Sequence, residues 1–182
     1  MSKIEYTKWL SVQNSGSIGA GFLFGKRVNN YEPSLRDLNS LAYSFKTINQ
    51  LLEEVHNVRI GNKYQHEEYE QRIVLTIGPT ETIINDFIDG IEITISTEEF
   101  TSILQAKKRF IEELKTINLQ EVVSEALMIM KQNLNVDEYI FYGVRIKNGL
   151  QVRFVMDKTD IEQLKLEEFL PTLRINEKIF EE

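Results

Sequence analysis

The stretch EYIFYGVRIKNGLQVRFVMD, residues 138–157, decides the fold. Apolar and β-branched residues fill its two halves, and Asn148-Gly149 stands between them. An Asn-Gly pair between two such runs is the strongest short-range signal for a β-hairpin. The stretch therefore predicts two antiparallel strands, 138–147 and 150–157, joined by a two-residue turn with positive φ at both turn positions.

Two amphipathic helices are predicted before this hairpin. Ser96 and Glu99 form a capping box that opens a helix over roughly 97–116. A further helix follows Asn118, which is expected to break or cap the chain. The apolar face of the first of these helices is expected to contain Phe100, Ile103, Leu104, Ile111 and Leu114. Thr159 and Glu162 are also expected to cap a short helix that ends before Pro171.

The longest apolar periodicity predicts a helix over 35–56. Apolar residues recur there at three- and four-residue spacing, which places them on one face. Ser34 and Asp37 resemble a capping box at its start. We expect this helix to hold the core, so that alanine at Leu41 or Phe45 would destabilise the fold.

Strand patterns complete the chain, and turn residues join them in pairs. Alternating or β-rich sequences predict the strands 4–12, 20–28, 72–77 and 91–95. Residues 80–88 fit either a strand or a short helix. Asn14 to Ser17 and Asp89-Gly90 are typical turn sequences.

The element order predicts an α+β fold, because it lacks the strict βαβ alternation of a parallel sheet. We expect a mainly antiparallel sheet built from hairpins, with three or four helices packed on one face. A length of 182 residues favours a single domain over 1–182. Two subdomains, 1–96 and 97–182, are the alternative.

Composition excludes several function classes. The chain has no cysteine, so disulfides and thiolate chemistry are ruled out. It carries 28 acidic and 21 basic residues, a net charge of −7, which disfavours general nucleic-acid binding and suits a basic partner. Neither a signal peptide nor an apolar stretch long enough for a membrane helix is visible, so the expected location is the cytoplasm.

The glycine-rich stretch from Gly16 to Arg27 resembles a phosphate-binding loop only superficially. The Walker pattern requires glycine where Ala20 stands and serine or threonine where Arg27 stands. A strand, and no helix, is predicted to follow the first glycines. We interpret them as a turn and as positions where the backbone packs closely.

The remaining reactive side chains suit structural roles. His56 falls near the end of the predicted long helix, and His66 lacks the spacing of a zinc motif. The basic run Lys107-Lys108-Arg109 is expected on a solvated helix face, paired with the glutamates that follow it. We therefore assign no catalytic residue, no metal site and no cofactor.

One polar segment is different in character, because it mixes tyrosines with glutamates. Its candidate partner-binding residues are Tyr64, Glu67, Glu68, Tyr69 and Glu70. Tyrosine is enriched at interfaces, and surrounding carboxylates favour a basic surface.

The leading functional hypothesis is a non-enzymatic protein-binding module. It would be a small acidic inhibitor, immunity or adaptor protein that acts on a basic partner such as a nuclease. The alternative is an enzyme or sensor that binds a small anionic ligand beside the sheet, with Tyr139, Tyr142, Arg145 and Arg153 as lining candidates. A two-residue turn would place the two arginines on opposite faces, which weakens a two-arginine clamp. Self-assembly through the helices is a third possibility.

Overall fold

The computed structural model describes residues 5–25, 44–63, 66–70, 73–88, 90–132, 142–145 and 149–182. The chain has a mixed α+β fold, as the sequence predicts. Its contacts form two compact units. The first comprises Met1–Glu5, Phe24–Glu113 and Lys178–Glu182, and the second comprises Tyr6–Leu23 and Leu114–Glu177. Within the described ranges, no helix is both long enough and apolar enough to cross a lipid bilayer.

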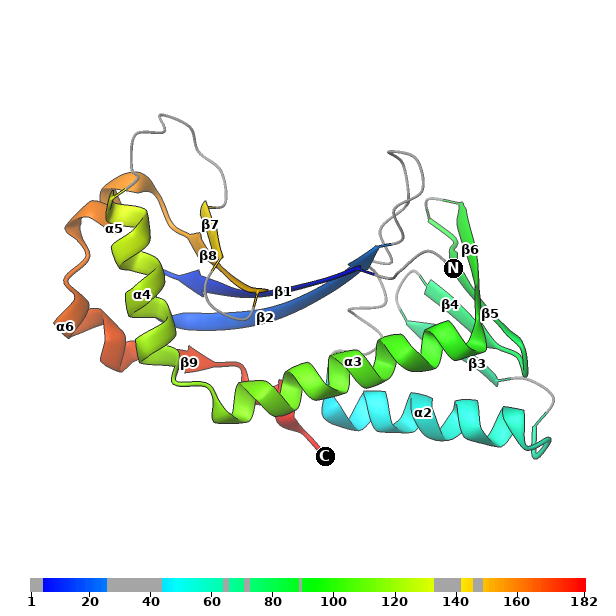
Figure 1. Ribbon diagram of the computed structural model, residues 1–182. Coiled ribbons are helices and arrows are strands. Elements are labelled where there is room, and N and C mark those ends of the chain that lie inside the picture. Colours follow the sequence, from blue (N-terminus) through cyan, green and yellow to red (C-terminus); the bar gives the residue numbers. More distant parts are fainter. Residues whose placement is uncertain are drawn as a thin grey trace. The chain divides into compact units, whose positions relative to one another are not determined.

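The first unit contains a four-stranded antiparallel sheet in the order β3-β4-β5-β6 (Figure 1). Its strands are β3 (His66–Glu70), β4 (Ile73–Ile77), β5 (Glu81–Asp86) and β6 (Ile91–Ser96). On β4, Ile73, Leu75 and Ile77 are buried while the residues between them are half-buried, which confirms the predicted alternation. The ambiguous segment 80–88 is a strand, because its residues complete the sheet between two neighbours.

Helix α3 (Thr97–Thr116) begins at the predicted capping box. The Glu99 N–H donates to Ser96 Oγ over 3.1 Å, and the Ser96 N–H donates to Glu99 Oε2 over 3.2 Å. This reciprocal pairing satisfies two backbone donors that a helix start leaves without partners. All the residues predicted for its apolar face are buried: Phe100, Ile103, Leu104, Ile111 and Leu114.

Helix α2 (Phe45–Arg59) is shorter than the predicted 35–56 helix, whose first residues lie outside the described ranges. A continuous helix through Ser44 is wrong, because this residue is extended (φ −117°, ψ 163°) and caps α2. Its Oγ accepts from the Thr47 N–H over 3.2 Å, an arrangement that helix start positions favour. Phe45 is half-buried, so it is not the fully buried core residue that the periodicity predicts.

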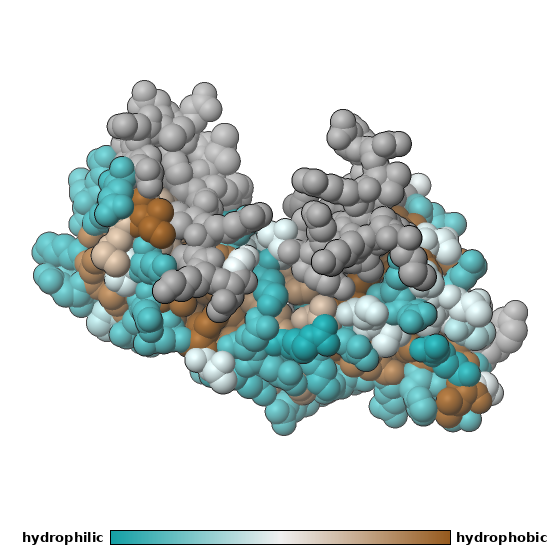
Figure 2. All heavy atoms as spheres, viewed as in Figure 1, coloured by the Kyte–Doolittle hydropathy of each residue, from teal (hydrophilic) through white to brown (hydrophobic). Residues whose placement is uncertain are grey.

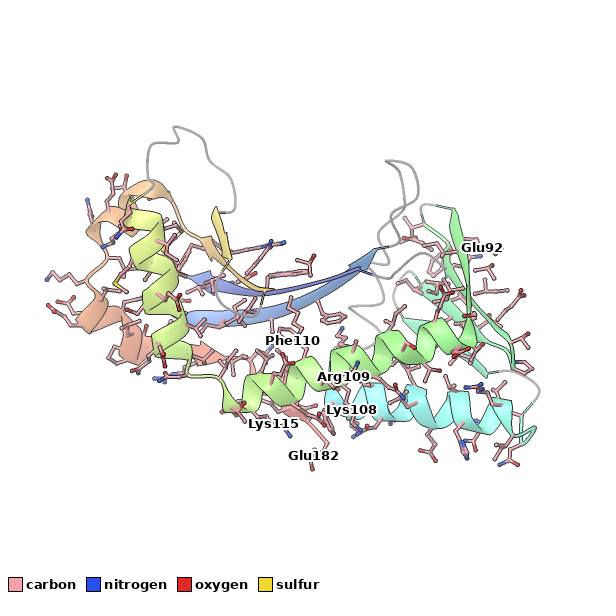
Figure 3. All side chains as sticks on the ribbon, viewed as in Figure 1. Glu92, Lys108, Arg109, Phe110, Lys115 and Glu182 are labelled. Atoms are coloured by element: carbon pink, nitrogen blue, oxygen red, sulfur yellow. The ribbon has the colours of Figure 1, made fainter. Side chains whose placement is uncertain are left out.

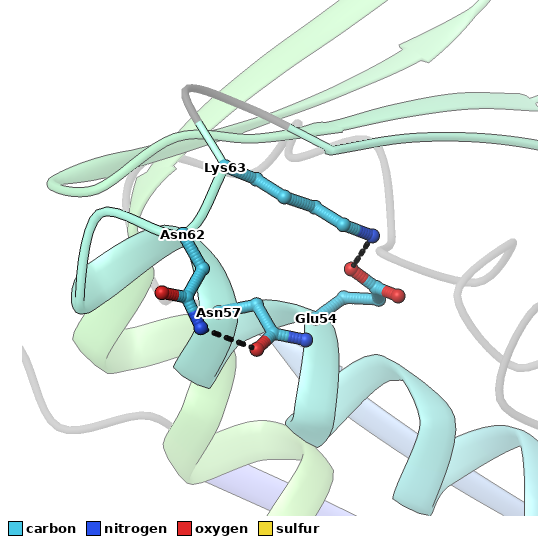
Figure 4. Close-up of polar contacts among 4 residues, drawn as sticks. All are labelled: Glu54, Asn57, Asn62 and Lys63. Atoms are coloured by element: carbon cyan, nitrogen blue, oxygen red, sulfur yellow. Dashed lines mark hydrogen bonds and ion pairs between the residues drawn. The ribbon is translucent and has the colours of Figure 1, made fainter.

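The end of α2 is fixed by its following loop (Figure 4). The Asn62 N–H donates to the Asn57 carbonyl over 2.9 Å, and its side chain reaches Asn57 Oδ1 over 3.4 Å. Lys63 Nζ pairs with Glu54 Oε2 at 2.6 Å. Gly61, in the turn between Asn57 and Asn62, has a φ of 79°, which a residue with a side chain rarely adopts.

The second unit contains a five-stranded sheet in the order β7-β8-β1-β2-β9. Its strands are β1 (Glu5–Gln13), β2 (Ser17–Gly25), β7 (Tyr142–Arg145), β8 (Leu150–Val155) and β9 (Arg174–Ile175). The predicted turn joins β1 to β2, with the Gly16 N–H donating to the Gln13 carbonyl over 2.9 Å. β1 pairs with β8, and β2 with β9, in parallel, so this sheet is mixed. Hairpin signals do not reveal such pairings, because they join segments far apart in the chain.

Helical segments complete this unit. Helix α4 (Leu119–Gln132) is capped by Asn118, whose Oδ1 accepts from the Glu121 N–H over 3.3 Å. Its buried residues are Val123, Ala126, Leu127 and Met130. Helix α5 (Lys158–Gln163) is capped by Asp157, two residues before the expected cap at Thr159. Short segments follow: α6 (Leu166–Phe169), η3 (Leu170–Thr172) and η4 (Glu177–Phe180).

The β7–β8 hairpin is present, but the predicted register is wrong by one residue. Val144 pairs with Val152, and Arg145 with Gln151, so the connection is longer than a two-residue turn. Gly149 has a φ of 73°, and Asn148 lies outside the described residues. A type I turn that ends in a left-handed glycine gives a three-residue hairpin loop, which explains why an Asn-Gly pair is compatible with this register.

Candidate functional site

The Tyr–Glu segment lies at one edge of the four-stranded sheet. Tyr64 falls outside the described residues, and the other candidates belong to β3. Glu67 pairs with Thr76, and Glu68 pairs with Leu75 on β4. Because neighbouring residues on a strand alternate between its faces, the register divides the segment between two faces. The three glutamates therefore do not share one line of the sheet.

The basic run on α3 does not form a solvated face, so that prediction is wrong. Lys107 is only 7% exposed, whereas Arg109 is exposed (Figure 3). Burial lowers the pKa of Lys107 from 10.5 to about 7. Lys108 Nζ donates to Asn49 Oδ1 over 2.8 Å and lies 4.9 Å from the Phe45 ring centroid, so it joins α3 to α2.

The exposed side of α3 is hydrophilic. The charge of a residue in this helix nevertheless does not show by itself on which side that residue lies. The exposed residues of α3 are Glu98, Ser102, Gln105, Arg109, Glu112, Glu113, Lys115 and Thr116. Figure 2 shows hydrophilic residues over most of the surface formed by α2 and α3. Lys107 stands three residues after Leu104 and four before Ile111, on the opposite, buried side. Helical spacing could therefore have identified it from the sequence.

His56 takes the place predicted for it. His56 is exposed in the last turn of α2, and His66 opens β3. In the part of the chain that the structure describes, no three His, Asp or Glu side chains gather as they would around a metal ion.

The glycines of β2 support an aromatic stack on the five-stranded sheet. A Cβ atom built at Gly21 would overlap the ring of Trp9 on the neighbouring strand β1. The indole therefore lies directly against the β2 backbone, the close packing that these glycines predict. Arg153 on β8 lies over the same indole, with its guanidinium carbon 4.3 Å from the ring centroid.

Arg153 is held in place by a second contact. Its guanidinium donates to Gln151 Oε1 over 3.1 Å. Gln151 pairs with Trp9 across the parallel β1–β8 ladder, and Arg153 pairs with Ser11. Among the described residues, Arg153 has no carboxylate partner and Ser11 Oγ has no hydrogen-bond partner. Most of the donors on this guanidinium therefore remain available.

We call this surface the open face, and the register defines it. It consists of Trp9, Ser11, Gln13, Ser17, Gly19, Gly21, Gln151, Arg153, Val155 and Arg174, which are half-buried or exposed. The opposite face is buried and contains Leu10, Val12, Ile18, Phe22, Leu150, Val152 and Phe154. Gly143 pairs with Arg153 and Arg145 with Gln151, so both β7 positions belong to the open face.

The predicted separation of the two arginines is therefore wrong. Arg145 stands opposite Gln151, which is two residues from Arg153 on β8. Residues two apart on a strand share a face, so both arginines occupy the open face. A register shift of one residue exchanges the faces of a strand, which accounts for the error.

The open face is basic, although the chain is acidic. Arg153 and Arg174 belong to it, the register assigns the position of Arg145 to it as well, and none of its described positions holds Asp or Glu. Glu5, on the same line of β1, is four residues from Trp9, about 13 Å along an extended strand. Around the Trp9 ring itself, the described donors are those of Arg153 and Gln151.

Comparison of the chain with protein-family models, with curated proteins and with solved structures finds no match.

Proposed function

We propose that this protein is a binding protein that holds an anionic ligand on the open face of its five-stranded sheet. The observation that carries the proposal is the Arg153 guanidinium, stacked on Trp9, bonded to Gln151 and without a described carboxylate partner. A half-buried arginine is usually paired with a carboxylate or phosphate, because its planar fork of donors matches their oxygens.

The surrounding donors suit the same ligand. Ser11 pairs with Arg153 across neighbouring strands, which lie about 4.8 Å apart. One oxygen-rich group could therefore accept from the guanidinium and from the Ser11 hydroxyl together. None of the described positions that define the open face is Asp or Glu, so none of these side chains competes there with a bound anion.

Replacement of Arg153 by glutamine is expected to weaken anion binding about tenfold to a hundredfold. This is the range that a lost charge-assisted hydrogen bond gives. Trp9 is the only tryptophan in the chain, so its fluorescence reports on the open face directly. Inorganic phosphate and succinate would be titrated at constant ionic strength, and the dissociation constants of wild type and R153Q compared.

Arg109→Gln is the matched control, because Arg109 is exposed on α3 and lies outside the open face. It removes the same charge and should leave the dissociation constant unchanged. If neither anion alters the Trp9 signal of the wild type, or if R153Q and R109Q bind alike, the proposal is wrong.

A protein-binding role through the Tyr–Glu segment is the second candidate function. The favouring observation is the position of β3 at an edge of the four-stranded sheet. Edge strands can accept a partner strand through their backbone, and glutamates along this edge would favour a basic one. In this role the chain would be an acidic inhibitor, immunity or adaptor protein.

Glutamine at Glu67, Glu68 and Glu70 together tests this second role. The triple variant keeps side-chain volume while it removes three negative charges, so the urea midpoint should hardly change. Association with an immobilised basic protein, such as a ribonuclease, should slow, and its dependence on salt should become shallower. An unchanged association rate at low salt would mean that this segment is not the contact.

A further inference from the structure

We infer that the ligand of the open face carries a planar ring beside its anionic group, as a nucleoside monophosphate does. The inference rests on the proposed function, since it specifies the ligand of the same site. The observation that supports it is the stack formed by Gly21, Trp9 and Arg153.

These residues form successive flat layers above the sheet. The Gly21 backbone is the floor, the Trp9 indole lies against it, and the Arg153 guanidinium covers the indole at 4.3 Å. A guanidinium is planar and weakly hydrated, so aromatic rings stack on it readily. Arg153 is half-exposed, and its side chain offers the next stacking surface to a ligand.

Next to the stack, the floor at Gly19 is backbone without a side chain. Gly19 is exposed, and a Cβ atom built there would meet only the Ser11 Cβ within 4 Å, at 3.9 Å. The neighbouring strand position therefore has no side chain to obstruct a flat group. A phosphate could at the same time accept from the Arg153 edge and from Ser11, which pair across the strands.

The charge of the rest of the chain limits the ligand to a small one. A polynucleotide would place many phosphates near a protein with a net charge of −7. One ring and one phosphate need only the open face. Base stacking is sequence-tolerant, because every base has a flat π-face, so the inference names a class of ligand and not one base.

The test compares adenosine 5′-monophosphate with ribose 5-phosphate, which keeps the phosphate and sugar and lacks the ring. Isothermal titration calorimetry should give wild-type binding at least about tenfold tighter for the nucleotide, the increment that one stacked base supplies. The variant is Arg153→Lys, which retains the charge but cannot stack as a plane. R153K should lose most of the nucleotide's advantage, so that adenosine 5′-monophosphate and ribose 5-phosphate bind this variant with similar affinity. Unchanged circular dichroism and urea midpoint would confirm that R153K folds.

Each other result overturns a defined part of the argument. Equal affinities of wild type for the two compounds would refute the planar ring and leave anion binding intact. An advantage for the nucleotide that persists in R153K would show that the ring does not stack on Arg153, and the inference would fall. If neither compound binds and phosphate and succinate also fail, the proposed function itself is wrong.

Discussion

Raising the pH from 7 to 10 is expected to stabilise the chain, relative to a Lys107→Met variant, by on the order of 3 kcal/mol. Burial lowers the pKa of Lys107 to about 7 in the folded protein, against an ordinary value of 10.5. Between these two values the unfolded state binds the proton more tightly than the folded state. Stability therefore rises as the pH rises through this window.

The direction of this stability change follows from the pH range in which the Lys107 ammonium group is charged in each state. Below pH 7, Lys107 is protonated in both states, so folding bears the full cost of burying a cation. As the pH approaches 10, the folded state holds a neutral amine and that cost disappears. Methionine has a similar length and no charge, so the variant lacks this dependence.

The measurement is a series of urea titrations of both proteins between pH 6 and pH 10. Other groups titrate in this range, but they are common to both proteins and cancel in the difference. Lys165→Met is the control, because the Lys165 side chain is 66% exposed and its ammonium group pairs with Glu168 at the surface. Its difference from wild type should stay flat. A flat difference for K107M as well would mean that the Lys107 ammonium remains charged and well solvated after folding.

Local signals predicted those elements whose causes are local. The Ser96–Glu99 box and the Asn118 cap act within one helical turn, and both are present with the expected bonds. The alternation of Ile73, Leu75 and Ile77 likewise reflects one strand with one buried face. In each case neighbouring residues supply both the signal and the contact.

The same reasoning failed where a local pattern had two interpretations. Lys107 belongs to a basic run, which suggested solvent, and also to the apolar helical spacing of α3, which places it inside. The spacing decides, because the rigid helix carries every residue on that side inward. At Ser44, in contrast, the apolar spacing gave the wrong prediction. Apolar residues continue in the sequence on both sides of Ser44, but the hydroxyl of this residue caps the start of α2.

The open face could not be predicted from the sequence, because parallel pairing creates it. Trp9 and Arg153 belong to distant segments, and only the β1–β8 ladder brings them together. The register of the hairpin then determines whether the position of Arg145 shares their face. A shift of this register by one residue moves that position to the other face of the sheet. Gly21 of β2 was correctly interpreted as a site of close packing, but its partner, the Trp9 ring, was not identifiable, and Gly19 is not closely packed.

Replacement of Phe100 by alanine is expected to lower the free energy of unfolding by about 3–5 kcal/mol, the range for a fully buried phenylalanine. Phe100 is completely buried in the first turns of α3. The backbone there has little freedom to close the resulting cavity, because two hydrogen bonds hold the backbone and the side chain of nearby Thr97. Its N–H donates to the Thr80 carbonyl over 2.9 Å, and its Oγ1 donates to the Gly78 carbonyl over 2.7 Å.

Phe87→Ala is the matched control, because this phenylalanine is 57% exposed in the turn after β5. The same atoms are removed there without a cavity, so the change should stay within about 0.5 kcal/mol. Urea titration of both variants at one pH gives the comparison, and equal denaturant slopes would allow the midpoints to be converted directly. A loss below about 1 kcal/mol for F100A would mean that the first turn of α3 moves to fill the space. The Thr97 hydrogen bonds would then not fix the start of the helix, and Thr97→Val should cost correspondingly little.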